Sequence, residues 1–256
     1  DCSEVDAEQI FVLTTGNCKN VYREEKCVYK YQCVDQILSE ILETYFEKTK
    51  ENVMKSVKKE FVKIIAIYSP IHRVGKTSFA IAFGKELAKF KKVLYLNMEE
   101  YFGYGEMFEQ IDNGNLGDAL YYTKQENSNF GLRLRMLVRT IDELDYIPPM
   151  PVSLDLKEVR WEEWKVLFKQ IVEDIVYEVI LLDIGESVQG LLKMLDLCDR
   201  IYMPVLEDDV SQEKLRQYEE NLQRLQLERL MEKTYMFIGL QDIENKMRQL
   251  VKEEVL

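Results

Sequence analysis

Short runs of apolar, mostly β-branched residues alternate along the chain with longer stretches in which apolar residues recur every three to four positions. The short runs predict strands and the longer stretches predict amphipathic helices. From residue 59 onward, the predicted strands are 62–68, 92–97, 144–148, 178–183, 200–205 and 234–239. The predicted helices are 76–90, 116–124, 161–175, 211–231 and 242–254. This alternation indicates an α/β fold of three layers with a mostly parallel sheet.

Residues 1–58 carry a different pattern. Residues 10–14 and 27–33 read as strands, and residues 34–50 read as one helix with apolar side chains at helical spacing. Two strands and one helix do not close a stable α/β domain by themselves. We therefore interpret residues 1–58 as the last part of a further domain with a linker, and 59–256 as the main domain.

Composition narrows the class of protein. Of the 256 residues, 46% are hydrophobic and 31% are charged, and the formal net charge is −12. This acidic balance argues against non-specific DNA binding but leaves room for a local basic patch, and we expect no specific nucleic-acid partner. The five cysteines include no C-x-x-C pair and the single histidine is His72, so the pattern argues against a zinc site and favours free thiols in a reducing cytosol.

The stretch from Ile64 to Ser78 carries the clearest chemical signal. An apolar strand runs into a turn that ends in Gly75-Lys76-Thr77, and a helical pattern follows, which is the context of a P-loop. In such a loop, backbone N–H groups surround a phosphate and the lysine adds a positive charge. The candidate nucleotide-binding residues are His72, Arg73, Val74, Gly75, Lys76, Thr77 and Ser78. The loop departs from G-x-x-x-x-G-K-[ST], because Pro70 stands at the first glycine position.

Two further strands end in polar residues. Residues 179–182 are apolar and are followed by Asp183, the form of a Walker B strand, so Thr77 and Asp183 are the candidate Mg²⁺ ligands. A strand-terminal aspartate that caps the next turn is the structural alternative. The strand at 92–97 ends in Asn97 and Glu99, which could polarise an attacking water or hold Mg²⁺. A plain strand exit explains these two residues equally well. The candidate catalytic residues are Asn97, Glu99 and Asp183.

In chain order, the phosphate loop, the Asn97/Glu99 strand, Asp183 and the segment 197–205 resemble the deviant-Walker ATPases of the ParA/MinD class. The pattern is most similar to their TadZ/CpaE branch, which the segment 146–149 and Asp155, Trp161 and Trp164 also fit. Members of this branch carry a receiver-like domain before the ATPase domain and help to position and assemble the bacterial Tad (Flp) pilus. The resemblance implies that residues 1–58 are the end of a receiver-like domain.

The resemblance further implies ATP and Mg²⁺ as cofactors, a homodimer, and pilus or secretion assembly proteins as partners. It implies a cytoplasmic protein that is recruited to the cell pole or to the inner-membrane face, with indirect membrane contact. The runner-up functions are a cycling ParA/MinD-type ATPase for partitioning or division-site positioning, and a nucleotide-free scaffold with a decayed P-loop.

The class pattern K-G-G-x-G-K-[ST] falls on residues 71–77, where the chain departs from it. Ile71 replaces the lysine that reaches the partner's phosphates in the class, and His72 and Arg73 replace two glycines. Asn97 and Glu99 stand where the class usually carries aspartates. The resemblance therefore implies nucleotide binding with slow or absent hydrolysis. Arg73 could replace the missing lysine, or it could be a solvent-facing loop residue.

Two helices complete the predictions. The 211–231 helix carries Leu215, Tyr218, Leu222, Leu225 and Leu227, a stripe that we expect to face the core, with a partner groove as the minor alternative. The C-terminal helix has its own apolar stripe, but acidic residues dilute its basic ones. A membrane-binding helix needs lysine and arginine on its polar face, so we expect this helix to pack against the domain.

Overall fold

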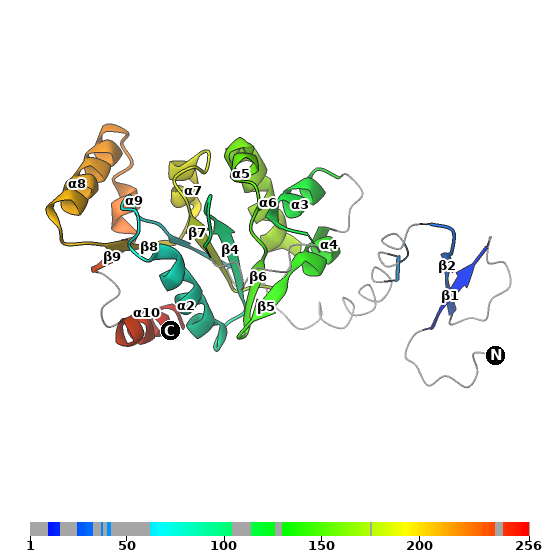
Figure 1. Cartoon of the computed structure of the whole chain (residues 1–256). Coiled ribbons are helices and arrows are strands. Elements are labelled where there is room, and N and C mark those ends of the chain that lie inside the picture. Colours follow the sequence, from blue (N-terminus) through cyan, green and yellow to red (C-terminus); the bar gives the residue numbers. More distant parts are fainter. Residues whose placement is uncertain are drawn as a thin grey trace. The chain divides into compact units, whose positions relative to one another are not determined.

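The computed structural model describes residues 10–15, 25–32, 37, 40, 41, 62–103, 114–125, 130–174, 176–238 and 243–255. The chain separates into two compact units, residues 1–59 and 60–256 (Figure 1).

In the first unit, β1 (Ile10–Thr14) pairs with β2 (Glu25–Tyr29) in parallel. Both predicted strands are therefore present, although β2 ends four residues before the predicted end. Of the predicted 34–50 helix, the described residues 37, 40 and 41 are helical, and the rest lies outside the described residues. Cys27 takes part in a disulfide, which corrects the expectation of a free thiol at that position. The receiver-like identity of this unit stays a prediction.

The second unit is built on a sheet whose seven described strands lie in the order β5-β6-β4-β7-β3-β8-β9. All neighbouring strands are parallel except the antiparallel pair β5 and β6. The strand bounds are β3 (Lys63–Ile67), β4 (Val93–Met98), β5 (Arg139–Ile141), β6 (Leu144–Ile147), β7 (Val179–Ile184), β8 (Arg200–Val205) and β9 (Thr234–Ile238). The order confirms the predicted mostly parallel sheet and places β3 and β7 side by side at its centre.

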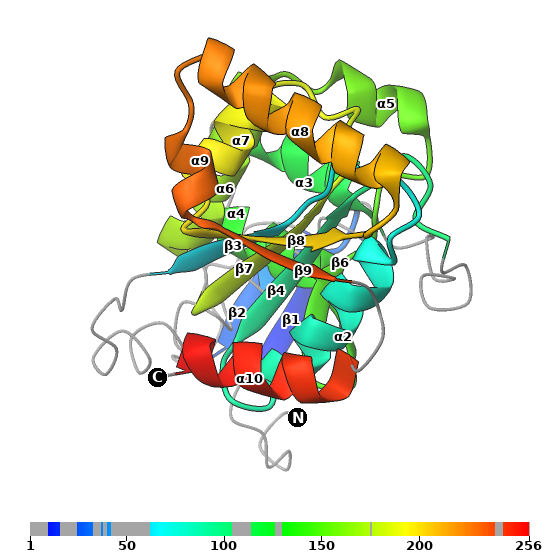
Figure 2. The same cartoon turned by 90° about the vertical axis from the view of Figure 1, so that its left-hand side faces the viewer.

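Helices cover both faces of this sheet, so the predicted three layers are present (Figure 2). The helices α2 and α10 lie on one face, and the helices from α3 to α9 lie on the other. Their bounds are α2 (Lys76–Ala88), α3 (Leu116–Thr123), α4 (Phe130–Leu137), α5 (Ser153–Glu158), α6 (Trp161–Asp174), α7 (Leu191–Leu197), α8 (Asp209–Arg224), α9 (Arg229–Glu232) and α10 (Ile243–Val255). Among the described helices, none is long and apolar enough to cross a membrane.

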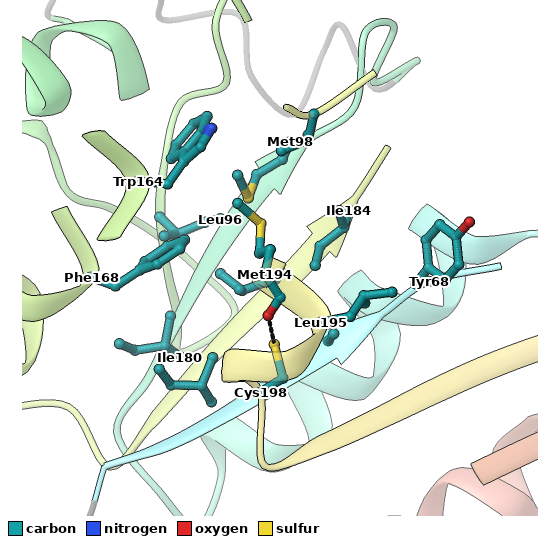
Figure 3. Close-up of a cluster of buried hydrophobic side chains, with 14 of the residues drawn as sticks. Tyr68, Leu96, Met98, Trp164, Phe168, Ile180, Ile184, Met194, Leu195 and Cys198 are labelled. Carbon is teal, nitrogen blue, oxygen red and sulfur yellow. Dashed lines mark hydrogen bonds between the residues drawn. The ribbon is translucent and has the colours of Figure 1, made fainter. Parts of the chain in front are cut away.

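The side-chain alternation of the central strands explains the two covered faces. Ile64 and Ala66 of β3 belong to the larger core beneath α3 to α9, whereas Ile65 and Ile67 face α2 and α10. Figure 3 shows part of the larger core, where Trp164 and Phe168 of α6 lie beside Leu96 and Met98 of β4. The two rings are stacked with centroids 6.2 Å apart. The continuous apolar runs of β3 and β7 therefore contribute side chains to the cores on both faces of the sheet, as expected of buried parallel strands.

The predicted 211–231 helix is wrong in one respect, because the structure breaks it into α8 and α9. The break contains Gln226, whose φ is 56°, a left-handed backbone that ends the helix. Leu215, Tyr218 and Leu222 are buried, which confirms the core stripe, but Leu225 is exposed in the break.

The C-terminal helix α10 packs on the domain as expected, with Met247, Leu250 and Val251 buried against α2 and its core. Its Glu254 is also buried. Glu254 accepts a hydrogen bond from the Tyr202 hydroxyl at 2.6 Å and forms ion pairs with Lys63 and Arg200. This carboxylate therefore fastens α10 to β3 and β8, a role that the sequence did not indicate.

Candidate functional site

The loop between β3 and α2 is anchored from below. The Ser69 hydroxyl donates a hydrogen bond to the Pro204 carbonyl oxygen at 2.8 Å and accepts one from the Ile71 N–H at 3.2 Å. Ile71 and Val74 are buried in the larger core, at 5% and 3% exposure. The loop is thus held to the C-terminal end of β8, and its apolar residues point into the protein.

The backbone of the loop is left-handed at two positions, with φ of 60° at Arg73 and 75° at Gly75. Gly75 is the N-cap of α2, and the Phe79 N–H donates to its carbonyl oxygen at 2.9 Å. The amides of the first helical turn, including those of Lys76 and Thr77, precede that bond and have no acceptor within the helix. Their N–H groups and the positive end of the helix dipole suit an anion.

His72, Arg73 and Ser78 lie on the outside of the loop and are exposed. His72 Nε2 is 3.4 Å from the Glu186 carboxylate, which follows β7. The structure therefore keeps all seven predicted nucleotide-binding residues in one loop and helix start, with Val74 turned inward. Whether each contacts a nucleotide stays a prediction.

Lys76 reaches across the ends of the two neighbouring strands β7 and β4. Its Nζ donates to the Ile184 carbonyl oxygen at 2.5 Å and lies 2.5 Å from the Glu99 carboxylate. It also lies 5.8 Å from the centre of the Tyr68 ring. The lysine is therefore directed over the edge of the sheet where β3, β4 and β7 end.

Asp183 is fully buried at the end of β7, directly beside Ile67 of β3 and Asn97 of β4 in the sheet register. Its Oδ2 accepts hydrogen bonds from the Tyr95 hydroxyl at 3.1 Å and from Asn97 Nδ2 at 3.4 Å. Asn97 Nδ2 also donates to the Tyr95 hydroxyl oxygen at 2.8 Å. Within the described part of the chain, Asp183 Oδ1 has no hydrogen-bond partner.

The surroundings of Asp183 raise its pKa to about 6. Burial is the largest cause, and the nearby Glu99 carboxylate adds to it. Lys76, Thr77 and Tyr95 act in the opposite direction and lower the pKa. The same burial, with the Asp183 charge beside it, raises the pKa of Tyr95 well above its usual value. A buried carboxyl group with a raised pKa, one oxygen of which has no hydrogen-bond partner among the described residues, is stabilised in its charged form by a cation beside it.

The three predicted catalytic residues thus meet at one edge of the sheet, and their catalytic roles stay predictions. Asn97 is buried, and its Oδ1 accepts the Glu99 N–H at 2.9 Å. Glu99 is partly exposed and paired with Lys76. Sequence reasoning missed Tyr95, which lies two residues before Asn97. The period-two pattern of a strand places residues 95 and 97 on the same face, so this signal was available.

The metal prediction rests on two side chains. Thr77 lies in the first turn of α2 near Asp183, and its hydroxyl lowers the pKa of that carboxyl. Among the residues that the structure describes, no group of three or more histidine, cysteine, aspartate or glutamate side chains could hold a metal ion. The arrangement therefore does not make a site closed by protein ligands alone, but it suits Mg²⁺, which keeps waters and takes phosphate oxygens as ligands.

Comparisons with known proteins support the fold. No family model and no curated protein matches the sequence. Among solved structures, a plasmid partition protein of Borrelia burgdorferi bound to AMPPNP is similar over 76% of this chain and 84% of its own, with a TM-score of 0.54 and 21% identity.

A ParA family ATPase of Chlorobium tepidum is similar over 75% of this chain and 82% of its own, with a TM-score of 0.55 and 15% identity. A chain of the MinC:MinD cell division protein complex of Aquifex aeolicus is similar over 69% of this chain and 68% of its own, with a TM-score of 0.52 and 18% identity. These likenesses show an α/β fold with a mostly parallel sheet of the kind found in ParA/MinD-like P-loop domains.

Proposed function

We propose that this protein binds ATP in the loop between β3 and α2 and uses it as a ParA/MinD-type nucleotide switch. The fold and the order of its motifs support the proposal, and one structural neighbour was solved with AMPPNP. The observation that carries the proposal is the buried Asp183 Oδ1, which has no hydrogen-bond partner among the described residues and lies close to Lys76 and Thr77 at the start of α2. A buried acceptor without a donor costs about 1–3 kcal/mol, so its retention favours a ligand at this edge.

The residues fit the two parts of the ligand. The amides of residues 72–77 and the Lys76 ammonium suit the phosphate groups, and Thr77 and Asp183 suit Mg²⁺. The metal supplies neutralisation of phosphate charge when it is bound. Tyr95 and Asn97 hold one oxygen of Asp183, which leaves the other oxygen for the cation or its water shell.

The site supports nucleotide binding with slow hydrolysis. Ile71, which stands where the ParA/MinD class has a lysine that reaches the partner's phosphates, is 5% exposed and packed in the core with Tyr68 and Val74. An apolar side chain in that place cannot stabilise charge in the transition state. We expect a turnover far below about one per second, which is slow against the usual range for phosphoryl transfer.

We further propose that ATP acts mainly by promoting a homodimer through the phosphate-loop face. Arg73 is exposed on that face and can make bidentate contacts to phosphate. A ligand that binds the dimer better than the monomer shifts the equilibrium toward the dimer. Sedimentation with Mg²⁺ and ATP tests this, with Arg73→Ala expected to weaken the ATP-dependent dimer. Lys89→Ala, on the exposed end of α2, is the control.

The finer proposal is that the protein positions and helps to assemble a Tad-type pilus. It rests on the resemblance to the TadZ/CpaE branch of residues 1–58 and of the segment 146–149 with Asp155, Trp161 and Trp164. Two of the structural neighbours are instead a plasmid partition protein and a cell division protein complex. Deletion in the source cell separates these roles. Loss of surface pili with normal plasmid and division-site placement supports the pilus role, and the reverse supports the cycling ATPase.

The deciding experiment is a calorimetric titration of the full chain with ATP in the presence and absence of Mg²⁺. We expect Mg²⁺-dependent binding that Lys76→Ala weakens by roughly 1.5–3 kcal/mol, the range for hydrogen bonds to charged groups. Lys85→Ala, which removes a lysine of the same helix paired to Asp142, should leave the affinity unchanged. Absence of binding at millimolar ATP would favour the nucleotide-free scaffold.

A further inference from the structure

The ammonium group that a phosphate would contact already has an anionic partner. Lys76 Nζ lies 2.5 Å from Glu99 Oε1, and the two side chains are 13% and 23% exposed. The pair is thus partly shielded from water, where attraction between opposite charges is stronger than at an open surface. Any phosphate that approaches Lys76 meets the negative charge of Glu99 beside it.

Three features place the Glu99 carboxylate at this point. The Asn97 side chain accepts the Glu99 N–H at 2.9 Å, which fixes the turn after β4. The Gly185 N–H donates to the Met98 carbonyl oxygen at 3.1 Å, which joins this turn to the end of β7. A Cβ atom on residue 185 would lie 2.9 Å from that carbonyl oxygen and 3.0 Å from Glu99 Oε2. Glycine at 185 therefore leaves the space that the carboxylate occupies.

We propose that Glu99 is an affinity-determining residue that holds Lys76 in the ligand-free loop and has to release it before a polyphosphate binds. The inference rests on the proposed nucleotide site and concerns what limits its affinity. Lys76 carries one positive charge, so the carboxylate and the phosphate compete for it. The free energy of the Lys76–Glu99 pair is subtracted from the free energy of binding, and the two anions also repel each other.

This role differs from the activation of water that the sequence pattern predicts for Glu99. A residue that only activates water leaves ground-state binding unchanged when it is replaced, and hydrolysis falls. A residue that competes for Lys76 weakens binding while it is present, so its removal strengthens binding. The two roles therefore predict different changes in the dissociation constant.

The test is isothermal titration calorimetry on the full chain with Mg²⁺-ATP and, separately, with tripolyphosphate, which has no base or sugar. The variants are Glu99→Gln and, as a second removal of the charge, Glu99→Ala.

The matched control is Glu100→Gln, because Glu100 is the next residue and is also ion-paired, to Lys157 at 3.0 Å. We expect Glu99→Gln to bind both probes about tenfold more tightly than the wild type, which corresponds to about 1.4 kcal/mol. Glu100→Gln should match the wild type.

Tighter binding of both probes by both Glu99 variants, with an unchanged Glu100→Gln, supports the proposal. Unchanged or weaker binding by the Glu99 variants, while the wild type binds ATP, overturns it and leaves the proposed nucleotide function standing. If the wild type and every variant fail to bind either probe, both proposals fall. Equal gains in Glu99→Gln and Glu100→Gln also overturn it, because they would reflect the lowered net negative charge rather than the Lys76 contact.

Discussion

Among the described residues of the second unit, the buried carboxylates are those of Asp183 and Glu254, and their surroundings differ. Both oxygens of Glu254 are engaged, one by Lys63 and the other by Tyr202 and Arg200. Asp183 has one engaged oxygen and one without a partner among the described residues, and its pKa is raised to about 6. Complete pairing indicates that the side chain stabilises the fold. Incomplete pairing of an equally buried carboxylate costs stability and favours the binding of a ligand.

The largest effect is expected at the fully paired carboxylate. Glu254→Gln should lower the free energy of unfolding by about 3 kcal/mol, because it leaves Lys63 and Arg200 without their buried partner and unpins α10. Urea unfolding of the full chain, followed by circular dichroism, measures the change.

The neighbouring Glu253→Gln is the control for that variant. Glu253 is exposed and its nearest cation is Arg200 at 3.7 Å, so we expect a change within about 0.5 kcal/mol. Equal losses of stability in the two variants would contradict the prediction that the buried, fully paired Glu254 stabilises the fold more than the exposed Glu253.

The opposite sign is expected at Asp183. Asp183→Asn should raise the free energy of unfolding at pH 7 by about 2 kcal/mol, since it removes a buried charge whose pKa is above its usual value. It should also abolish the Mg²⁺ dependence of ATP binding. Thermal unfolding and calorimetry of the same sample measure both properties.

The raised pKa of Asp183 also predicts how the stability difference between Asp183→Asn and the wild type depends on pH. The folded state holds the Asp183 proton more tightly than the unfolded state, whose pKa is near 3.8, so the wild type loses stability as pH rises from 3.8 to about 6. The advantage of Asp183→Asn should therefore be absent near pH 4 and complete above pH 6. An advantage that is constant across this range would contradict an origin in the buried charge.

The sequence predicted the sheet and most of its cover because the signals were local. Runs such as 179–182 are apolar on both faces, and their period and length identify central strands without knowledge of their neighbours. The helices α4, α5 and α7 and the strand β5 were not predicted. In α4, apolar and basic residues alternate without a clear face, and β5, α5 and α7 have too few residues for a period to appear.

The site was predictable as a list of residues but not as a set of contacts. The Gly75-Lys76-Thr77 turn and Asp183 follow strands, and the carboxyl ends of parallel strands meet at one edge of a sheet. The pairing of Lys76 with Glu99, and of Tyr95 with Asp183, depends on the order β4-β7-β3, which the sequence does not state. The partners of Glu254 on β3 and β8 could not be predicted either, because a helical period does not show which strands a helix packs against.

Tyr95 tests whether the partial pairing of Asp183 matters. Tyr95→Phe removes the hydroxyl that donates to Asp183 Oδ2 and accepts from Asn97. Since Tyr95 lowers the pKa of Asp183, its loss should raise that pKa further and cost about 1 kcal/mol of stability, the usual contribution of one hydrogen bond. Chemical denaturation at pH 7 measures this.

The matched control is Tyr146→Phe on β6, the residue opposite Tyr95 in the sheet register, which is also buried. A smaller loss for Tyr146→Phe than for Tyr95→Phe would support the network around Asp183. Equal losses would indicate a general cost of removing a hydroxyl from this sheet.

The smallest effect is expected in the loop itself, at Arg73. Its φ of 60° places a side chain in the left-handed region, which costs a non-glycine residue about 1–2 kcal/mol, while glycine there pays about 0.5–1 kcal/mol in lost chain freedom. Arg73→Gly should therefore gain about 0.5 kcal/mol in unfolding free energy, whereas Arg73→Ala keeps the strain and should gain nothing. Thermal unfolding without nucleotide compares the two variants.

If both variants lose the ATP-dependent dimer but only Arg73→Gly gains stability, the strained backbone and the guanidinium act separately. The arginine is then kept in an unfavourable conformation because of the contact that its side chain makes. If Arg73→Gly instead loses stability, contacts of the arginine side chain hold the left-handed backbone in place. Arg73 would then stabilise the fold, as Glu254 does, rather than cost stability, as Asp183 does.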